Sequence, residues 1–360
     1  METLSLATPE RFIENKEHYT YQVKLLIDFY NQGLLPEIAS ITVEPRYGYV
    51  ASIDYVDGGR RIIYGHDPGF NAGSAELLAK DKGYSKFMLR SLDINCPGGD
   101  EFLLPWWADT LRQADRSVDE SVIQTTEEAH DYIEGALQYP VYIKPVSGSQ
   151  GSGVKKIFEQ SELDAAFAEY NEERVKVALV EESLQMPDYR LLMFDGELVN
   201  AYRREPFSVE GDGEQTVQGL IDAKLEKFVE QGRQIHYEEN QLAIQSRLAR
   251  FGLSLMDIPT PNQHVQLLDV SNLSAGGVPV DVMHEIHPHW EELVRRVAKG
   301  FNLRVCGVDL ACEDITSPES EYSVLEVNAT PGAKQFMASG EAGREKLEAL
   351  FLNFFRTSKQ

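Results

Sequence analysis

A glycine- and serine-rich segment at residues 147–153 lies between two short runs of strand-forming residues, and it limits the fold more than any other feature. Tyr142-Ile-Lys144 precedes the segment, and Val154-Lys-Lys-Ile157 follows it. Glycine and serine restrict the backbone little, so such a loop can turn its N–H groups toward phosphate oxygens. The spacing is not that of a P-loop, and a strand follows where a Rossmann turn would need a helix. The segment therefore indicates a strand–loop–strand unit, either a phosphate-binding loop or an ordinary hairpin loop.

Hydrophobic periodicity predicts both helices and strands along the whole chain. Helices are expected at residues 17–32, 74–92, 127–138, 217–231, 239–250, 289–301 and 341–355. Strands are expected at residues 49–56, 61–64, 141–144, 175–181, 189–194, 198–203, 304–311 and 322–327. The two kinds of element mix without regular β-α-β alternation. This favours an α+β fold with subdomains built around antiparallel sheets.

Length and charge exclude several classes of protein. A chain of 360 residues exceeds one ordinary core, so we expect two or three packed subdomains. The net charge of −24 argues against a nucleic-acid partner, which would need basic residues to neutralise phosphates. No apolar run approaches the ~18 residues of a membrane helix. Only three cysteines are present, at positions 96, 306 and 312, and this number is typical of a reducing cytoplasm.

Acidic and amide side chains on two predicted strands near the end of the chain suggest a metal site. Glu326 and Asn328 are two residues apart and therefore share one face of a strand. Asp309 lies on a strand that we expect to be adjacent. Oxygen ligands on one face suit Mg²⁺ bound together with substrate phosphates, although a Glu-x-Asn pattern is also common on a solvated face.

Several segments resemble the ATP-grasp superfamily of carboxylate–amine ligases, and most closely the ATP-grasp part of cyanophycin synthetases. The segments follow one another in the order that the family uses. The glutathione-synthesising bifunctional enzymes and the ribosomal-protein glutamate ligases are more distant. The resemblance covers roughly residues 70–335. Its motifs are Ala79-Lys-Asp-Lys82, Tyr139-Pro-Val-Tyr-Ile-Lys144, the Gly/Ser loop, Val180-Glu-Glu182, Asp188-Tyr-Arg190, Arg203-Arg-Glu-Pro206, Gly211-Asp-Gly213, Asn272-Leu-Ser-Ala-Gly-Gly277, Gly307-Val-Asp309 and Glu326-Val-Asn-Ala-Thr-Pro-Gly332.

The resemblance implies an ATP-grasp fold, in which two α+β subdomains clasp ATP beside a small N-terminal α/β region. The expected division is 1–75 for the N-terminal region, 76–179 for the central subdomain with the loop, and 180–360 for the C-terminal subdomain with the metal site. The implied activity is the ATP-dependent joining of a carboxylate to an amine through an acyl phosphate. The alternatives are a phosphotransferase of the same fold and a non-catalytic nucleotide-binding module.

The resemblance also implies a role for each matching residue. The residues that would contact the ATP phosphates are Lys82, Lys144, Ser149, Gly151 and Gly153. The residues that would contact adenine are Glu181, Glu182 and Leu184, and Asp188 would contact the ribose. The ligands of Mg²⁺, for which Mn²⁺ is an alternative, are Asp309, Glu326 and Asn328. The groups nearest the γ-phosphate and the acyl phosphate are Arg190, Arg203, Arg204 and Asn272.

Asp269 departs from the family pattern, which tends to place Arg or Asn just before the residue matching Asn272. An acidic residue at this position suggests contact with a substrate ammonium group. We therefore expect an amino acid or a short peptide as a substrate. No membrane partner is expected, and a homodimer is the oligomeric state we anticipate.

Overall fold

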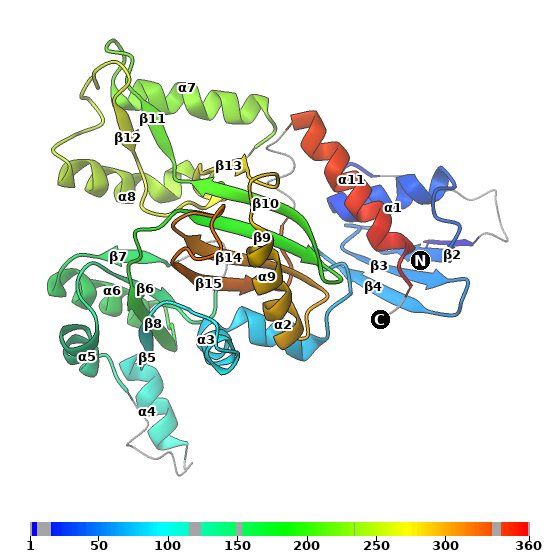
Figure 1. Cartoon of the computed structure of the whole chain (residues 1–360), viewed down its shortest axis with the longest axis horizontal. Coiled ribbons are helices and arrows are strands. Elements are labelled where there is room, and N and C mark those ends of the chain that lie inside the picture. The colour runs from blue at the N-terminus through cyan, green and yellow to red at the C-terminus, as the bar shows by residue number, and fades with distance from the viewer. Residues whose placement is uncertain are drawn as a thin grey trace.

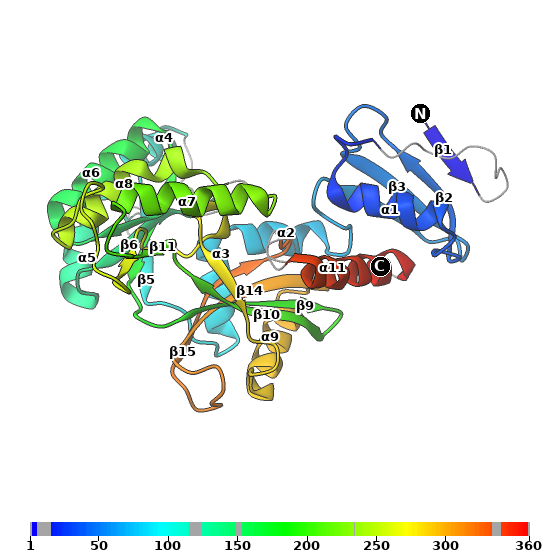
Figure 2. The ribbon, with the colours of Figure 1, turned by 90° about the horizontal axis from the view of Figure 1, so that it is seen from above.

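The computed structural model describes residues 2–5, 16–114, 124–148, 153–233, 235–332 and 340–358. It has the mixed α+β character expected from the sequence, with three larger antiparallel sheets and helices packed against them (Figures 1 and 2). None of the helices in these ranges is long and apolar enough to span a membrane.

The N-terminal sheet has the strand order β1-β2-β3-β4, formed by β1 (Glu2–Ser5), β2 (Ile38–Val43), β3 (Val50–Tyr55) and β4 (Arg60–Tyr64). Helix α1 (Tyr21–Asn31) and the distant C-terminal helix α11 (Gly340–Arg356) pack into its core. The buried Arg61 guanidinium joins the two ends of the chain, since it donates a 2.7 Å hydrogen bond to the Phe354 carbonyl. Figure 1 shows α11 lying beside α1.

The central sheet has the order β5-β8-β6-β7, formed by β5 (Gly99–Leu103), β8 (Val177–Glu182), β6 (Val141–Pro145) and β7 (Lys155–Ile157). Helices α5 (Glu128–Ala136) and α6 (Gln160–Glu172) contribute to its core, and the short α4 (Pro105–Gln113) extends away from it in Figure 1. Side chains alternate along β6: Ile143 is buried in this core, so Tyr142 and Lys144 point to the other face.

The C-terminal sheet has the order β13-β10-β9-β14-β15, formed by β13 (Val278–Asp281), β10 (Glu197–Glu205), β9 (Asp188–Phe194), β14 (Val305–Cys312) and β15 (Tyr322–Asn328). Helix α9 (Pro288–Gly300) covers one face, where Trp290 is fully buried. Between β10 and β13 the chain makes an excursion with its own small core, formed by β11 (Ser208–Glu210), α7 (Val217–Glu230), α8 (Tyr237–Arg250), β12 (His264–Gln266) and the short 3₁₀ turn η2 (Leu273–Ala275).

The single helix expected at residues 74–92 is wrong, because two helices form there: α2 (Gly73–Lys80) and α3 (Lys82–Ser91). Asp81 between them is extended, and its carboxylate accepts a 3.0 Å hydrogen bond from the Tyr84 N–H as the N-cap of α3. Asp81 also forms an isolated β-bridge with Ser147. The break therefore brings Lys82, the first residue of α3, to the start of the Gly/Ser loop.

Two features bear on the expected division at residues 75 and 179, which remains a proposal. Helix α11 supplies Leu347, Phe351 and Phe354 to the core of the N-terminal sheet. Helices α2 and α3 supply Ala79 and Leu89 to the core of the C-terminal sheet. Both connections cross a boundary drawn from the sequence.

Candidate active site

A cavity of about 720 Å³ lies between the central sheet and the C-terminal sheet, and the excursion also contributes to its wall. Most of the residues singled out in the sequence line it. They are Lys82, Lys144, Glu181, Glu182, Leu184, Asp188, Arg204, Asn272, Asp309 and Glu326. Segments more than 200 residues apart in sequence therefore meet around one space.

Other expected site residues are not part of this wall in the described ranges. Gly153, Arg190 and Asn328 lie behind or beside it. Arg203 is on the opposite face of β10 from Arg204, where its guanidinium pairs with Glu205 at 2.8 Å and 41% of its side chain is exposed. The structure thus brings Arg204, but not Arg203, to the cavity. Ser149 and Gly151 lie outside the described residues.

Two carboxylates face each other across neighbouring strands at the floor of the cavity. Asp309 on β14 is the direct register partner of Glu326 on β15, and Gly307 is the partner of Asn328. In an antiparallel pair such partners share one face of the sheet, as predicted. Glu326 is also 3.4 Å from the Lys82 ammonium. The Asn328 Nδ2 is buried and has no hydrogen-bond partner in the described part of the chain.

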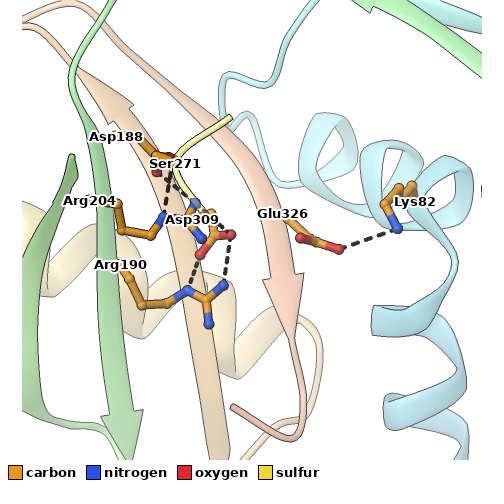
Figure 3. A network of polar contacts seen from close by, with 7 residues as sticks. All are labelled: Lys82, Asp188, Arg190, Arg204, Ser271, Asp309 and Glu326. Atoms are coloured by element: carbon orange, nitrogen blue, oxygen red, sulfur yellow. Dashed lines mark hydrogen bonds and ion pairs between the residues drawn. The ribbon is translucent and has the colours of Figure 1, made fainter. Parts of the chain in front are cut away.

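Two arginines hold Asp309 from the side (Figure 3). Arg190 on the adjacent strand β9 donates to both of its carboxylate oxygens, and Arg204 on β10 reaches Oδ2 at 2.9 Å. Burial acts to raise the pKa of the Asp309 carboxyl, but the two guanidinium groups outweigh burial and hold this pKa below its usual value. Asp309 is therefore an anion at neutral pH.

Asp188 completes this network. Arg204 donates to its two oxygens at 2.7 and 3.1 Å, and the Ser271 hydroxyl donates to one of them. Both oxygens of the carboxylate are thus occupied, so a ribose hydroxyl at Asp188 would have to share or displace these donors. Ser271 was missed in the sequence because it reaches Asp188 from a segment 83 residues away.

Two lysines hold Glu181 on the central sheet. Lys144 donates to Glu181 Oε1, and Lys86 of α3 lies 2.7 Å from Oε2. Burial acts against the Glu181 carboxylate, but the two ammonium groups lower its pKa. The carboxylate expected to hold the adenine edge is thus already shared by two cations. Lys86 was not singled out in the sequence, where it is one more lysine on a helix.

The first described end of the Gly/Ser loop is hydrogen-bonded to the start of α3, and the second lies beside Pro145. The Lys82 N–H donates to the Val146 carbonyl at 3.0 Å, and its ammonium donates to the Gly148 carbonyl at 3.0 Å. Gly153 has a φ of +72°, and a Cβ there would lie 3.1 Å from the Pro145 ring, so both backbone and space require glycine. The loop therefore begins and ends beside the lysines predicted to contact phosphates.

Asp269 lines the cavity but already has a cationic partner in the chain. Arg247 of α8 donates to its carboxylate, and the Tyr142 hydroxyl donates to its backbone carbonyl at 3.3 Å. Arg247 therefore supplies a positive charge beside Asp269 from within the chain. This weakens the basis for a contact between Asp269 and a substrate ammonium group.

Residues 110–270 match the family model described as the RimK-like ATP-grasp domain. These residues are therefore similar to an ATP-grasp domain. Among curated proteins, a cyanophycin synthetase from Crocosphaera subtropica is 32% identical over 232 residues, which cover 61% of this chain and 26% of that protein. A bifunctional glutathione biosynthesis protein from Mannheimia succiniciproducens is 29% identical over 345 residues, covering 92% of this chain and 42% of the relative.

A solved structure supports the same fold. The bifunctional glutathione synthetase from Pasteurella multocida superposes with a TM-score of 0.55 at 22% identity, covering 92% of this chain and 43% of that one. At this identity the similarity concerns the fold alone. The chain spans less than half the length of these relatives, 26% and 42% of the two curated proteins.

Proposed function

We propose that the chain is an ATP-dependent carboxylate–amine ligase that forms an amide or peptide bond and releases ADP and phosphate. One observation carries the proposal: a single cavity is lined both by the cations Lys82, Lys144 and Arg204 and by the register-paired carboxylates Asp309 and Glu326. This arrangement suits a triphosphate with a bound cation, and it lies in a chain that is similar to an ATP-grasp domain over residues 110–270.

In the proposed reaction, an oxygen of the substrate carboxylate attacks the γ-phosphorus of ATP, and the bond to ADP breaks. The unprotonated amine nitrogen of the second substrate then attacks the carbonyl carbon of the acyl phosphate, the bond from that carbon to the phosphate oxygen breaks, and the nitrogen releases a proton as phosphate leaves. Lys82 and Lys144 would hold the phosphates, and Arg204 would face the charge that develops during transfer. Their contribution is positioning and charge stabilisation without a covalent enzyme intermediate.

The residues at the cavity floor fit Mg²⁺. The carboxylates of Asp309 and Glu326 are in register, and Asn328 lies two residues along β15 from Glu326, on the same face, where its amide oxygen would add a third oxygen ligand. Magnesium is usually held by one or two carboxylates together with substrate phosphates. Asp309, Glu326 and Asn328 would hold the ion, which would neutralise charge on the transferring phosphoryl group. Mn²⁺ accepts the same kind of ligands.

For the substrates, we propose an amino acid or a short peptide. The support comes from relatives whose names describe cyanophycin and glutathione synthesis, both of which concern amino-acid compounds. The test is a screen of amino acids and short peptides in pairs, with ADP release measured and products identified by mass spectrometry. A variant with Glu326→Gln serves as the inactive control.

Each outcome of the screen separates the candidate functions. ADP release that requires both a carboxylate and an amine, with a product of the summed mass less water, supports the ligase. ADP release with a phosphorylated product and no need for an amine would indicate a phosphotransferase. Nucleotide binding without turnover of any pair would indicate a binding module.

A cytoplasmic location and a homodimer also remain proposals. The three cysteines, which are free in the structure, support a reducing compartment. The mass of the purified protein, measured by light scattering, would test the dimer.

A further inference from the structure

Lys86 is a buried cation just behind the cavity wall, and it has no role in the proposed reaction. Its residue is 4% exposed, and its ammonium donates to the Pro97 carbonyl at 2.7 Å. Its second partner is Glu181 Oε2, also at 2.7 Å. A fully buried lysine is rare unless it is paired, so this position requires Glu181.

Glu181 pairs with a second lysine as well as with Lys86. Its other oxygen, Oε1, accepts a hydrogen bond from Lys144, which faces the cavity. Within the described part of the chain, neither lysine forms an ion pair with a second carboxylate. We call Lys86, Glu181 and Lys144 the buried triad, and its formal charge is +1.

An uncompensated charge in a low-dielectric interior is unfavourable, and a ligand of opposite charge relieves it. Lys86 is sealed behind the wall, whereas Lys144 opens onto the cavity, so an anion can reach the triad from the cavity side. Lys86 also comes from α3, whose first residue, Lys82, lies beside the Gly/Ser loop. The triad thus connects the helix, the central sheet and the phosphate region.

We propose that Lys86 is a positioning residue that determines how strongly the cavity prefers charged nucleotides. By sharing Glu181, it prevents that carboxylate from neutralising Lys144, so that Lys144 presents a full positive charge to the phosphates. The inference rests on the proposed function for the presence of a nucleotide in the cavity. The inference assigns to Lys86, which lies outside the cavity wall, control over the positive charge that Lys144 presents at the wall.

The test compares binding of ATP with Mg²⁺ and binding of adenosine, by calorimetry and without any second substrate. The quantity of interest is the ratio of the adenosine dissociation constant to the ATP dissociation constant. Lys86→Met removes one positive charge and should lower this ratio about tenfold, because a charge a few ångströms from the phosphates acts through the protein interior. Glu181→Gln should raise the ratio, and the double variant Lys86→Met/Glu181→Gln, again +1, should restore it to within about threefold of wild type.

Two controls separate charge from structure. Lys80→Met removes an exposed lysine from α2 and should leave the ratio within about twofold of wild type. Lys86→Arg keeps the charge and should do the same. If Lys86→Met does not fold, Lys86→Gln keeps a donor for the Pro97 carbonyl and should show the same tenfold loss.

The proposal is overturned if Lys86→Met, or Lys86→Gln in its place, weakens ATP and adenosine equally, because a purely structural role predicts an unchanged ratio. It is also overturned if Lys86→Arg lowers the ratio as much as the neutral variants do. A wild-type protein that binds no nucleotide would remove both this inference and the proposed function. Binding that follows the charge series without any amine-dependent product would remove the ligase proposal alone.

Discussion

Replacing the two facing carboxylates one at a time should give the same loss of activity but different losses of stability. Asp309→Asn and Glu326→Gln each remove a charged ligand proposed for Mg²⁺, so each should reduce ADP formation at least about 100-fold. The side chain of Asp309 is 4% exposed and is gripped by Arg190 and Arg204. The side chain of Glu326 is 30% exposed, with one ammonium 3.4 Å away.

The stability difference follows from these contacts. Breaking a buried charge pair typically costs about 3–5 kcal/mol, because the partner is left uncompensated. We expect about 3 kcal/mol for Asp309→Asn, at the lower end, since Arg204 keeps its pair with Asp188. For Glu326→Gln we expect less than about 1 kcal/mol, the usual range for a partly solvated pair.

The assay combines ADP release, using a substrate pair found in the screen, with urea denaturation followed by circular dichroism. Glu321→Gln, an exposed carboxylate just before β15, is the matched control and should change neither quantity. Wild-type turnover in either site variant would refute the metal assignment. Equal losses of stability in the two variants would refute the inference that its pairs with Arg190 and Arg204 make Asp309 more important for stability than Glu326.

Three further outcomes are expected. Hydrogen exchange at residues 147–153 should slow when a non-hydrolysable ATP analogue and Mg²⁺ are added, and an unchanged rate would exclude a phosphate clamp. Arg204→Ala should lower kcat about 100-fold, whereas Arg203→Ala should stay within about twofold of wild type, and equal effects would contradict the placement of these side chains. Burial and the neighbouring carboxylate of Asp67 raise the pKa of Glu76 to about 7, so its contribution to stability is complete below about pH 4.5 and is lost as the pH rises through 7. Glu76→Gln should therefore make the melting temperature less dependent on pH between 5 and 8, and parallel curves for the two proteins would contradict the assignment.

Elements with a strong local pattern could be predicted from the sequence. The hairpin of β3 and β4, the strand β9 and the helix α9 all lie within a few residues of their expected positions. The strand β5, Gly99–Leu103, was missed because its Gly-Asp-Glu start carries no alternation, and it forms by pairing with β8 from a distant part of the chain. The break at Asp81 was missed because the apolar spacing continues across it.

The site shows the same limit. The facing of Asp309 and Glu326 followed from strand periodicity, because the two strands are close in sequence. The grip of Arg190 on Asp309 depends on β9 lying next to β14, a strand order that local patterns do not encode. Lys86 and Arg247 are hidden for a related reason: each is an ordinary basic residue on a helix until its distant carboxylate is placed beside it.

Helix α11 makes the core of the N-terminal sheet depend on a distant part of the chain. The N-terminal strands are made first, yet their core includes Leu347, Phe351 and Phe354, and Arg61 has its 2.7 Å partner on the carbonyl of Phe354. Part of the apolar face of the N-terminal sheet is therefore covered by a helix that lies nearly 300 residues later in the sequence. Bringing such distant segments together has an entropic cost, which the packing of α11 against the sheet must offset. A truncation before residue 347 would remove these side chains from the core and should destabilise the N-terminal sheet.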